Sequence, residues 1–197
     1  MKMRRSTLKI TQAAMIAALA YVGFQFLRID IPVGTERTAF HLGNTFVVLG
    51  ALLLGGGWGG AAGALGLAMA DLTSGYVTSA PKTFLLKLII GLLVGLVSRR
   101  FFRMEKETDP KKQSVIALTS SAVALGCNVV LDPLFGYFYK TYIFGIPQDM
   151  SAALSKIGSV TTLVNAALST VVTVILWTAL YPALRHAHAL TWQDRDF

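Results

Sequence analysis

The segment from His41 to Leu92 is hydrophobic almost throughout, and yet it contains two ionisable residues, Asp71 and Lys87. A charged side chain at the depth of a bilayer costs roughly 3 kcal/mol or more on insertion scales, so such a residue is a functional-site hypothesis by default. The same segment holds the sequences HLGN, GGGWGG, DLTSGY and APKTFLLK. These features indicate a membrane protein that binds something inside the bilayer.

The composition supports a membrane class and excludes several others. Of the 197 residues, 54% are hydrophobic and only 14% are charged, which is too little charge to cover a soluble domain. The length allows one membrane domain, taken as residues 1–197. The net charge of +8 does not indicate a nucleic-acid partner, because the basic residues cluster beside apolar segments. Cys127 is the single cysteine, so an intramolecular disulfide and a cysteine-rich metal site are excluded.

Apolar runs near the spanning length of roughly 20 residues predict six helices. They lie at about 10–27, 43–56, 58–75, 82–100, 114–138 and 159–183. Basic residues precede the first run, fill the loop after the fourth and follow the last, which places both termini in the cytoplasm by the positive-inside rule. The sequence therefore predicts an all-α integral membrane protein, a bundle of six transmembrane helices with both termini cytoplasmic.

Five polar side chains from four of these helices are predicted to lie at one depth near the outer surface. With about 1.5 Å of rise per residue, Asp71 and Lys87 each lie within two turns of the outer ends of the third and fourth helices. Asn128 and Asp132 are four residues apart on one face of the fifth helix, and Asn165 lies about two turns into the sixth. This polar layer fits a binding pocket. It also fits a structural Asp71–Lys87 ion pair with asparagines that hold the helices together.

Two connections bracket the polar layer from outside, RIDIPVGTERTAFHLGN and FGYFYKTYIFGIPQDM. Both mix aromatic and polar residues, a combination suited to a lid that stacks on a small ring. Their aromatic residues, including Tyr137, equally fit the aromatic belt at the headgroup level. His41 and Asn44 stand where the first connection meets its helix and are candidates for the pocket, although Asn44 also suits a helix cap. A lone histidine offers no metal site.

The first helix carries a strip of small residues, Ala13, Ala14, Ala17 and Ala18, which form two overlapping AxxxA pairs. Such a strip suits close contact with another helix, from this chain or from a partner. The sequence has no Walker A lysine loop and no G-x-S-x-G or H-E-x-x-H motif. We therefore predict that the chain is not an enzyme and that a transporter built from it takes its energy from an ion gradient or from another subunit.

The chain resembles the substrate-binding S component of energy-coupling factor (ECF) transporters, the vitamin importers of bacteria and archaea. The resemblance runs through the alanine strip, FHLGN, ALLLGGGWGG, DLTSGY and SAPKTFLLK in that order. It implies a multi-pass protein of the cytoplasmic membrane that captures a vitamin or precursor at its outer face. It also implies docking on a transmembrane coupling subunit through Ala14 and Ala18, or through Ala13 and Ala17, with the first outer loop as the gate.

In that family two ATPase subunits use the ATP, so the resemblance implies no cofactor for this chain. Family pockets are built from outer-half residues of the later helices, which agrees with Lys87, Asn128, Asp132 and Asn165. The polar layer favours a small, nearly neutral heteroaromatic cargo, hydroxymethylpyrimidine-like or pyridoxine-like first and riboflavin or another vitamin next. An anion such as pantothenate is disfavoured if Asp71 pairs with Lys87. The alternative function is a membrane scaffold or assembly subunit with a structural polar layer and no cargo.

Overall fold

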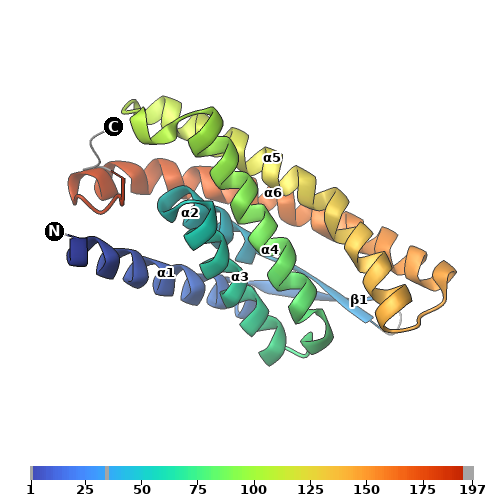
Figure 1. Cartoon of the computed structure of the whole chain (residues 1–197). Helices are drawn as coiled ribbons and strands as arrows, with labels where there is room; N and C mark the ends of the chain where they lie inside the picture. Colours follow the sequence, from blue (N-terminus) through green and yellow to red (C-terminus); the bar gives the residue numbers. More distant parts are fainter. Residues whose placement is uncertain (1, 34–35, 193–197) are drawn as a thin grey trace.

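The computed structural model describes residues 2–33 and 36–192, and within them the chain forms six α-helices and one β-hairpin (Figure 1). The hairpin follows the first helix, and short 3₁₀ or π turns, η1 to η4, flank α4 and α5. The first turn of α1 and the last turn of α6 lie at one end of the bundle, called here the terminal end (Figure 1). The opposite end, toward which the hairpin extends, is the hairpin end. The elements are α1 (Lys2–Gln25), β1 (Arg28–Val33), β2 (Glu36–His41), α2 (Gly43–Leu54), α3 (Gly56–Thr73), η1 (Val77–Ser79), α4 (Ala80–Gly95), η2 (Leu96–Phe101), η3 (Met104–Lys106), α5 (Pro110–Phe138), η4 (Tyr139–Ile143) and α6 (Gln148–His186).

The segment predicted as the first outer loop is a β-hairpin, the one strand pair that the described residues add to an otherwise all-helical fold. Its two strands pair antiparallel, with Asp30 opposite Ala39. Ile29, Ile31 and Val33 alternate with other residues along β1, and this period of two is the signature of a strand. The alternation is visible in the sequence, but the mixture of aromatic and polar residues in the same segment predicts a loop.

The helices cover the predicted runs but differ in their ends. Helix α6 begins at Gln148 instead of at about 159, so it takes up part of the connection expected before it. Four helical stretches are long and apolar enough to cross a membrane, which makes this a helical membrane protein with several spans. That α2 and α3 also cross the membrane stays a prediction, and so does the cytoplasmic location of both termini. The four stretches are Ser6–Gln25, Val77–Phe101, Pro110–Ile143 and Gln148–His186.

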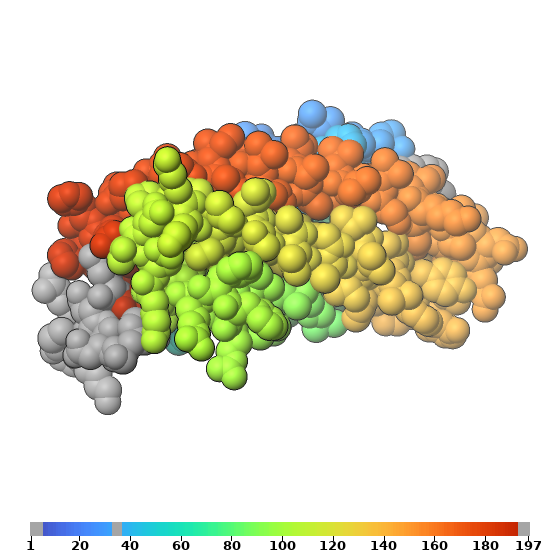
Figure 2. All heavy atoms as spheres, turned by 90° about the horizontal axis from the view of Figure 1, so that it is seen from above, coloured from blue at the N-terminus to red at the C-terminus, as the bar shows by residue number. Residues whose placement is uncertain are grey.

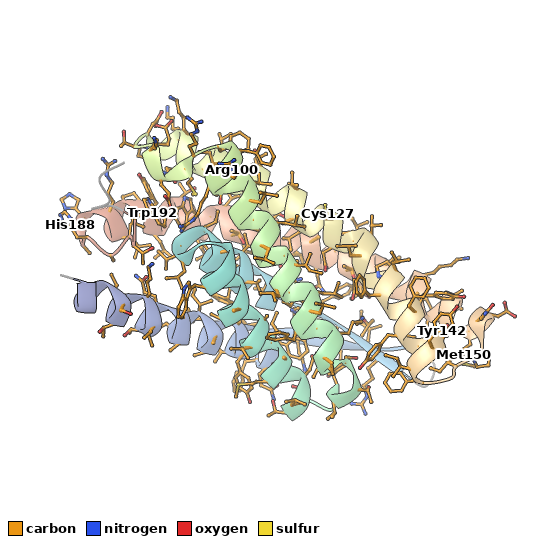
Figure 3. The ribbon with its side chains drawn as sticks, in the orientation of Figure 1. Arg100, Cys127, Tyr142, Met150, His188 and Trp192 are labelled. Atoms are coloured by element: carbon orange, nitrogen blue, oxygen red, sulfur yellow. The ribbon has the colours of Figure 1, made fainter. Side chains whose placement is uncertain are left out.

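Helices α5 and α6 lie side by side along the molecule and form its longest layer (Figure 2). Large apolar side chains face outward on both, such as Val123 on α5 and Val171 on α6. So much exposed apolar surface is what a protein in contact with lipid requires. Figure 3 shows Tyr142 and Met150 where the α5–α6 pair reaches the hairpin end, and His188 at the terminal end.

Helices α2, α3 and α4 pack so closely that only glycine fits at their contacts. A Cβ atom added to Gly59 would overlap the backbone of Gly50 on α2, and one added to Gly91 on α4 would overlap the backbone of Gly60. Small residues let helix backbones approach to this degree in membranes. Gly55 turns the chain between α2 and α3 with a φ of 91°, a conformation that favours glycine. Gly50, Gly59, Gly60 and Gly91 are called here the glycine seam.

Arg99 holds the terminal end together. Its guanidinium donates to the carbonyl oxygens of Leu52 and Leu53 at 3.2 Å each, which satisfies groups that the end of α2 leaves unpaired. It pairs with Glu105 at 2.5 Å, and its Cζ lies 4.8 Å from the centroid of the Trp192 ring. These contacts connect η2, α2 and the segment after α6, so they close the end of the bundle opposite the hairpin.

Candidate functional site

A cavity of about 440 Å³ lies toward the hairpin end, between β2 and parts of α3, α4, α5 and α6. Its volume falls within the range of roughly 300–1,000 Å³ that small-molecule sites occupy. Strand β2 covers one side of the cavity with Arg37, Thr38, Ala39 and His41. The helices contribute the polar layer that the sequence places at this depth.

Seven of the eight residues predicted to bind the substrate line this cavity, and Tyr137 does not. Tyr137 contacts Phe138 instead, with ring centroids 5.6 Å apart, while its neighbours Gly136 and Tyr139 line the cavity. The structure thus brings residues from β2, α2, α3, α4, α5 and α6 to one place. That they bind a substrate stays a prediction. The seven are His41, Asn44, Asp71, Lys87, Asn128, Asp132 and Asn165.

Asp132 is bonded to protein groups on two neighbouring helices. Its Oδ1 accepts a hydrogen bond from Nζ of Lys82 at 2.9 Å, and its Oδ2 accepts one from the Thr162 hydroxyl at 2.7 Å. The bonds join α4, α5 and α6 around the cavity, so Asp132 holds its walls in place. Sequence reasoning missed Lys82, because a lysine in the first turn of a spanning helix also suits the headgroup region.

The Asp71–Lys87 ion pair considered from the sequence is absent from the ion pairs within 4.0 Å among the described residues. Lys87 is 9% exposed, and its ammonium makes no hydrogen bond or ion pair to the part of the chain that the structure describes. Asp71 is 4% exposed, and its Oδ2 has no hydrogen-bond partner there. Both groups line the cavity and can still form hydrogen bonds with a molecule inside it.

Two asparagines add unpaired amide atoms to the same cavity. Both polar atoms of the Asn128 side chain, and Oδ1 of Asn44, are buried without a partner among residues 2–33 and 36–192. Asn44 is not the cap of α2, because that position belongs to Leu42 and carries no side-chain hydrogen bond. Leaving a buried polar group unsatisfied costs about 1–3 kcal/mol, so such groups call for an explanation such as a ligand or water. The arrangement fits a polar molecule in the cavity.

His41 is neutral at the end of β2. Its Nδ1 accepts a hydrogen bond from the backbone N–H of Gly43 at 3.1 Å, so a proton on the neutral ring belongs on Nε2. Burial, and after it the positive charge of Lys87, lowers the pKa of His41 from 6.5 to about 3. The ring also packs on Phe24, with centroids 4.7 Å apart. His41 therefore fixes the corner between the hairpin and α2 without adding charge to the cavity.

This neutral histidine predicts a pH dependence of stability. Because the pKa is lower in the folded state than the unfolded 6.5, the unfolded state takes up the proton first and stability falls as pH drops below 6.5. At pH 5 the loss attributable to this group is up to about 2 kcal/mol. We expect His41→Asn to flatten the pH dependence of the melting temperature between pH 6.5 and 4, because Asn Oδ1 can accept the Gly43 bond and does not titrate. An unchanged slope would show that His41 is already accessible to protons.

The aromatic side chains that line the cavity are Tyr76, Tyr139 and Phe144. None of them is among the pocket residues predicted from the sequence. The Tyr76 hydroxyl donates to Oδ1 of Asp30 on β1 at 3.0 Å. Burial and the Asp30 carboxylate raise the pKa of Tyr76 to about 12. These rings give a cavity that is otherwise polar the surfaces on which a heteroaromatic ring can stack.

The alanine strip of α1 is divided between two faces. Ala14 and Ala18 are exposed, beside exposed Met15 and Leu19, whereas Ala13 and Ala17 pack against the small apolar cluster of Ile16, Leu54 and Ala62. Of the two registers predicted from the sequence, the Ala14 and Ala18 register is the one open to a partner helix. This strip lies apart from the cavity, whose lining contains no residue of α1.

Comparison with known proteins gives one family. The sequence model described as "ECF-type riboflavin transporter, S component" matches residues 4–182, which includes all six helices but for the ends of α1 and α6. Searches of curated proteins and of solved structures give no match to this chain. No three His, Cys, Asp or Glu side chains of the described residues form a possible metal site.

Proposed function

The chain belongs to the family of ECF-type riboflavin transporter S components, and we propose that it captures a heteroaromatic vitamin in the cavity beside the hairpin. The observation that carries this proposal is the set of buried polar groups in that cavity. The Asn128 amide has no hydrogen-bond partner among the described residues, and the buried Lys87 makes no ion pair with them. A cation and an amide that line one cavity can donate to ring carbonyls or nitrogens and accept from a ring N–H. The aromatic side chains beside them supply the stacking.

For the cargo we rank riboflavin first, and hydroxymethylpyrimidine or pyridoxine second. A three-ring flavin occupies more of a cavity of about 440 Å³ than a single pyrimidine or pyridine ring does. The matched family is described by riboflavin, which points the same way. Lys87 has no anionic partner within 4.0 Å among the residues that the structure describes, so pantothenate also belongs in the test.

The partners we propose are a transmembrane coupling subunit and two ATPase subunits, in a bacterial or archaeal cytoplasmic membrane. The chain has no phosphate-binding lysine loop, so hydrolysis of ATP must come from elsewhere. The exposed Ala14 and Ala18 face of α1 is the surface proposed for the coupling subunit.

A thermal-shift screen of the detergent-purified chain tests the capture function. Riboflavin, hydroxymethylpyrimidine, pyridoxine and pantothenate are compared, because a ligand at 100 times its dissociation constant adds about 2.7 kcal/mol of stability. We expect one strong stabiliser, with riboflavin first. If none of the four stabilises the chain while a helical membrane protein co-purifies with it, the scaffold function is favoured instead.

Docking is tested with bulky substitutions on α1. Ala14→Trp and Ala18→Trp are expected to keep the melting temperature and vitamin binding but to reduce vitamin uptake by cells at least tenfold, because the indole holds the partner helix away. Val171→Trp on α6, which is 58% exposed in the native chain, is the matched control and is expected to transport normally. Normal uptake by both alanine variants would remove this face from the mechanism.

A further inference from the structure

Asn165 uses its side chain to hold the hairpin. Its Oδ1 accepts a hydrogen bond from the backbone N–H of His41 at 3.0 Å, and its Nδ2 donates to the carbonyl oxygen of Ala39 at 2.9 Å. The side chain is buried at 5% exposure on α6, opposite the strand. Both polar atoms of this predicted substrate-binding residue are thus engaged with the backbone of β2.

The geometry of the hairpin explains why one amide can make both bonds. In an antiparallel pair, alternate residues direct their N–H and C=O groups away from the partner strand. Ala39 and His41 are two residues apart on β2, so their outward groups point to the same side, toward α6. The outer edge of a strand carries N–H and C=O groups that have no partner strand and can bond to another chain segment. The Asn165 amide satisfies two such groups as the N–H and C=O groups of one residue in a third strand would.

The attachments of the hairpin differ in kind. At its ends the chain joins it to α1 and α2, and the Tyr76 hydroxyl holds β1 through an exposed hydrogen bond to Asp30. On the α6 side two Asn165 bonds, one buried and one partly buried, secure β2, the strand that covers the cavity. Breaking these two bonds would leave β2 held to α6 by packing alone, while the hairpin stays tethered at α1 and α2.

We propose that Asn165 is a positioning residue that latches the hairpin over the cavity and thereby sets the rates at which the substrate enters and leaves. The inference rests on the proposed capture function for its substrate, but the latch itself is a property of the empty protein. It assigns to Asn165 a different role from that of Asn128, whose amide is free to meet the substrate.

Hydrogen exchange tests the latch without any substrate. In Asn165→Ala the His41 amide loses its acceptor, so exchange in the peptide covering residues 37–42 should rise at least tenfold. Thr162→Val is the matched control, because Thr162 lines the same cavity from the same helix but bonds to Asp132 and not to the hairpin. Equal exchange in both variants and the native chain would overturn the latch. A vitamin screen without hits would count against the capture function and leave this result standing.

Binding kinetics test the consequence for the substrate, with riboflavin as the first probe. A latch limits passage in both directions, so Asn165→Ala should raise the association and dissociation rate constants together, each about tenfold, with a smaller change in Kd. Asn128→Ala should raise the dissociation rate alone. Asn165→Asp keeps an acceptor for His41 and loses the donor to Ala39. Its two rate constants should therefore lie between those of the native chain and those of Asn165→Ala, and this variant replaces the alanine variant if the latter does not fold. A rise in dissociation alone for both Asn165 variants would overturn the proposal and make Asn165 a substrate contact.

Discussion

Gly59→Ala and Gly91→Ala should each prevent the chain from folding stably in detergent, although each adds one methyl group. The new Cβ would overlap the backbone of Gly50 or Gly60, which no change of side-chain conformation can relieve. The helices must separate, and overpacking of this kind costs about 3 kcal/mol or more, a large share of a typical stability of about 5–15 kcal/mol. We expect a fall in the yield of monodisperse protein and a melting temperature lower by ten degrees or more.

Gly57→Ala is the matched control for this prediction. Gly57 lies in the same glycine run on α3, but a Cβ added there meets no atom within 4 Å. Alanine also has the higher helix propensity, so this variant should be as stable as the native chain or slightly more stable. If all three variants have the same melting temperature, the helices α2, α3 and α4 do not pack as closely as the structure shows.

The candidate site could be predicted largely from the sequence, because its signal was strong and local. Asp71, Lys87 and Asn128 stand out in apolar segments, and helix length alone places them at a common depth. The structure adds their convergence on one cavity. Counting residues along helices fixes depth well, since each residue adds a constant rise.

What the sequence did not reveal is which polar groups bond to each other. Asp132 pairs with Lys82 and not with Lys87, and the two lysines are five residues apart on α4. Asn165 bonds to a strand in a segment that the sequence predicts to be a loop. Pairing depends on helix rotation and on the hairpin, and neither follows from hydropathy. The glycine run GGGWGG is visible in the sequence, but which helices meet along the glycine seam depends on the tertiary fold.

Replacing Lys87 with methionine should have opposite effects on stability and on binding. The ammonium is buried beside the cavity with no ion pair among the described residues, and a buried charge without a partner is costly. Methionine keeps the length and apolar stem, so we expect Lys87→Met to stabilise the empty protein by about 1–2 kcal/mol. A hydrogen bond from a charged donor is worth about 1.5–3 kcal/mol, so the same change should weaken vitamin binding about ten- to a hundredfold.

Lys82→Met gives the contrast that makes this prediction decisive. Lys82 is paired with Asp132 at 2.9 Å, and removing it leaves the carboxylate without its counter-ion. Breaking such a pair destabilises the protein, by about 1–3 kcal/mol for a pair that is only partly buried. Unfolding of the empty variants and titration with the vitamin therefore separate the two lysines. A gain in stability with a loss of binding at Lys87 alone marks it as a group kept for the substrate. Lower stability with unchanged affinity at Lys87 would mark it as a structural charge, like Lys82.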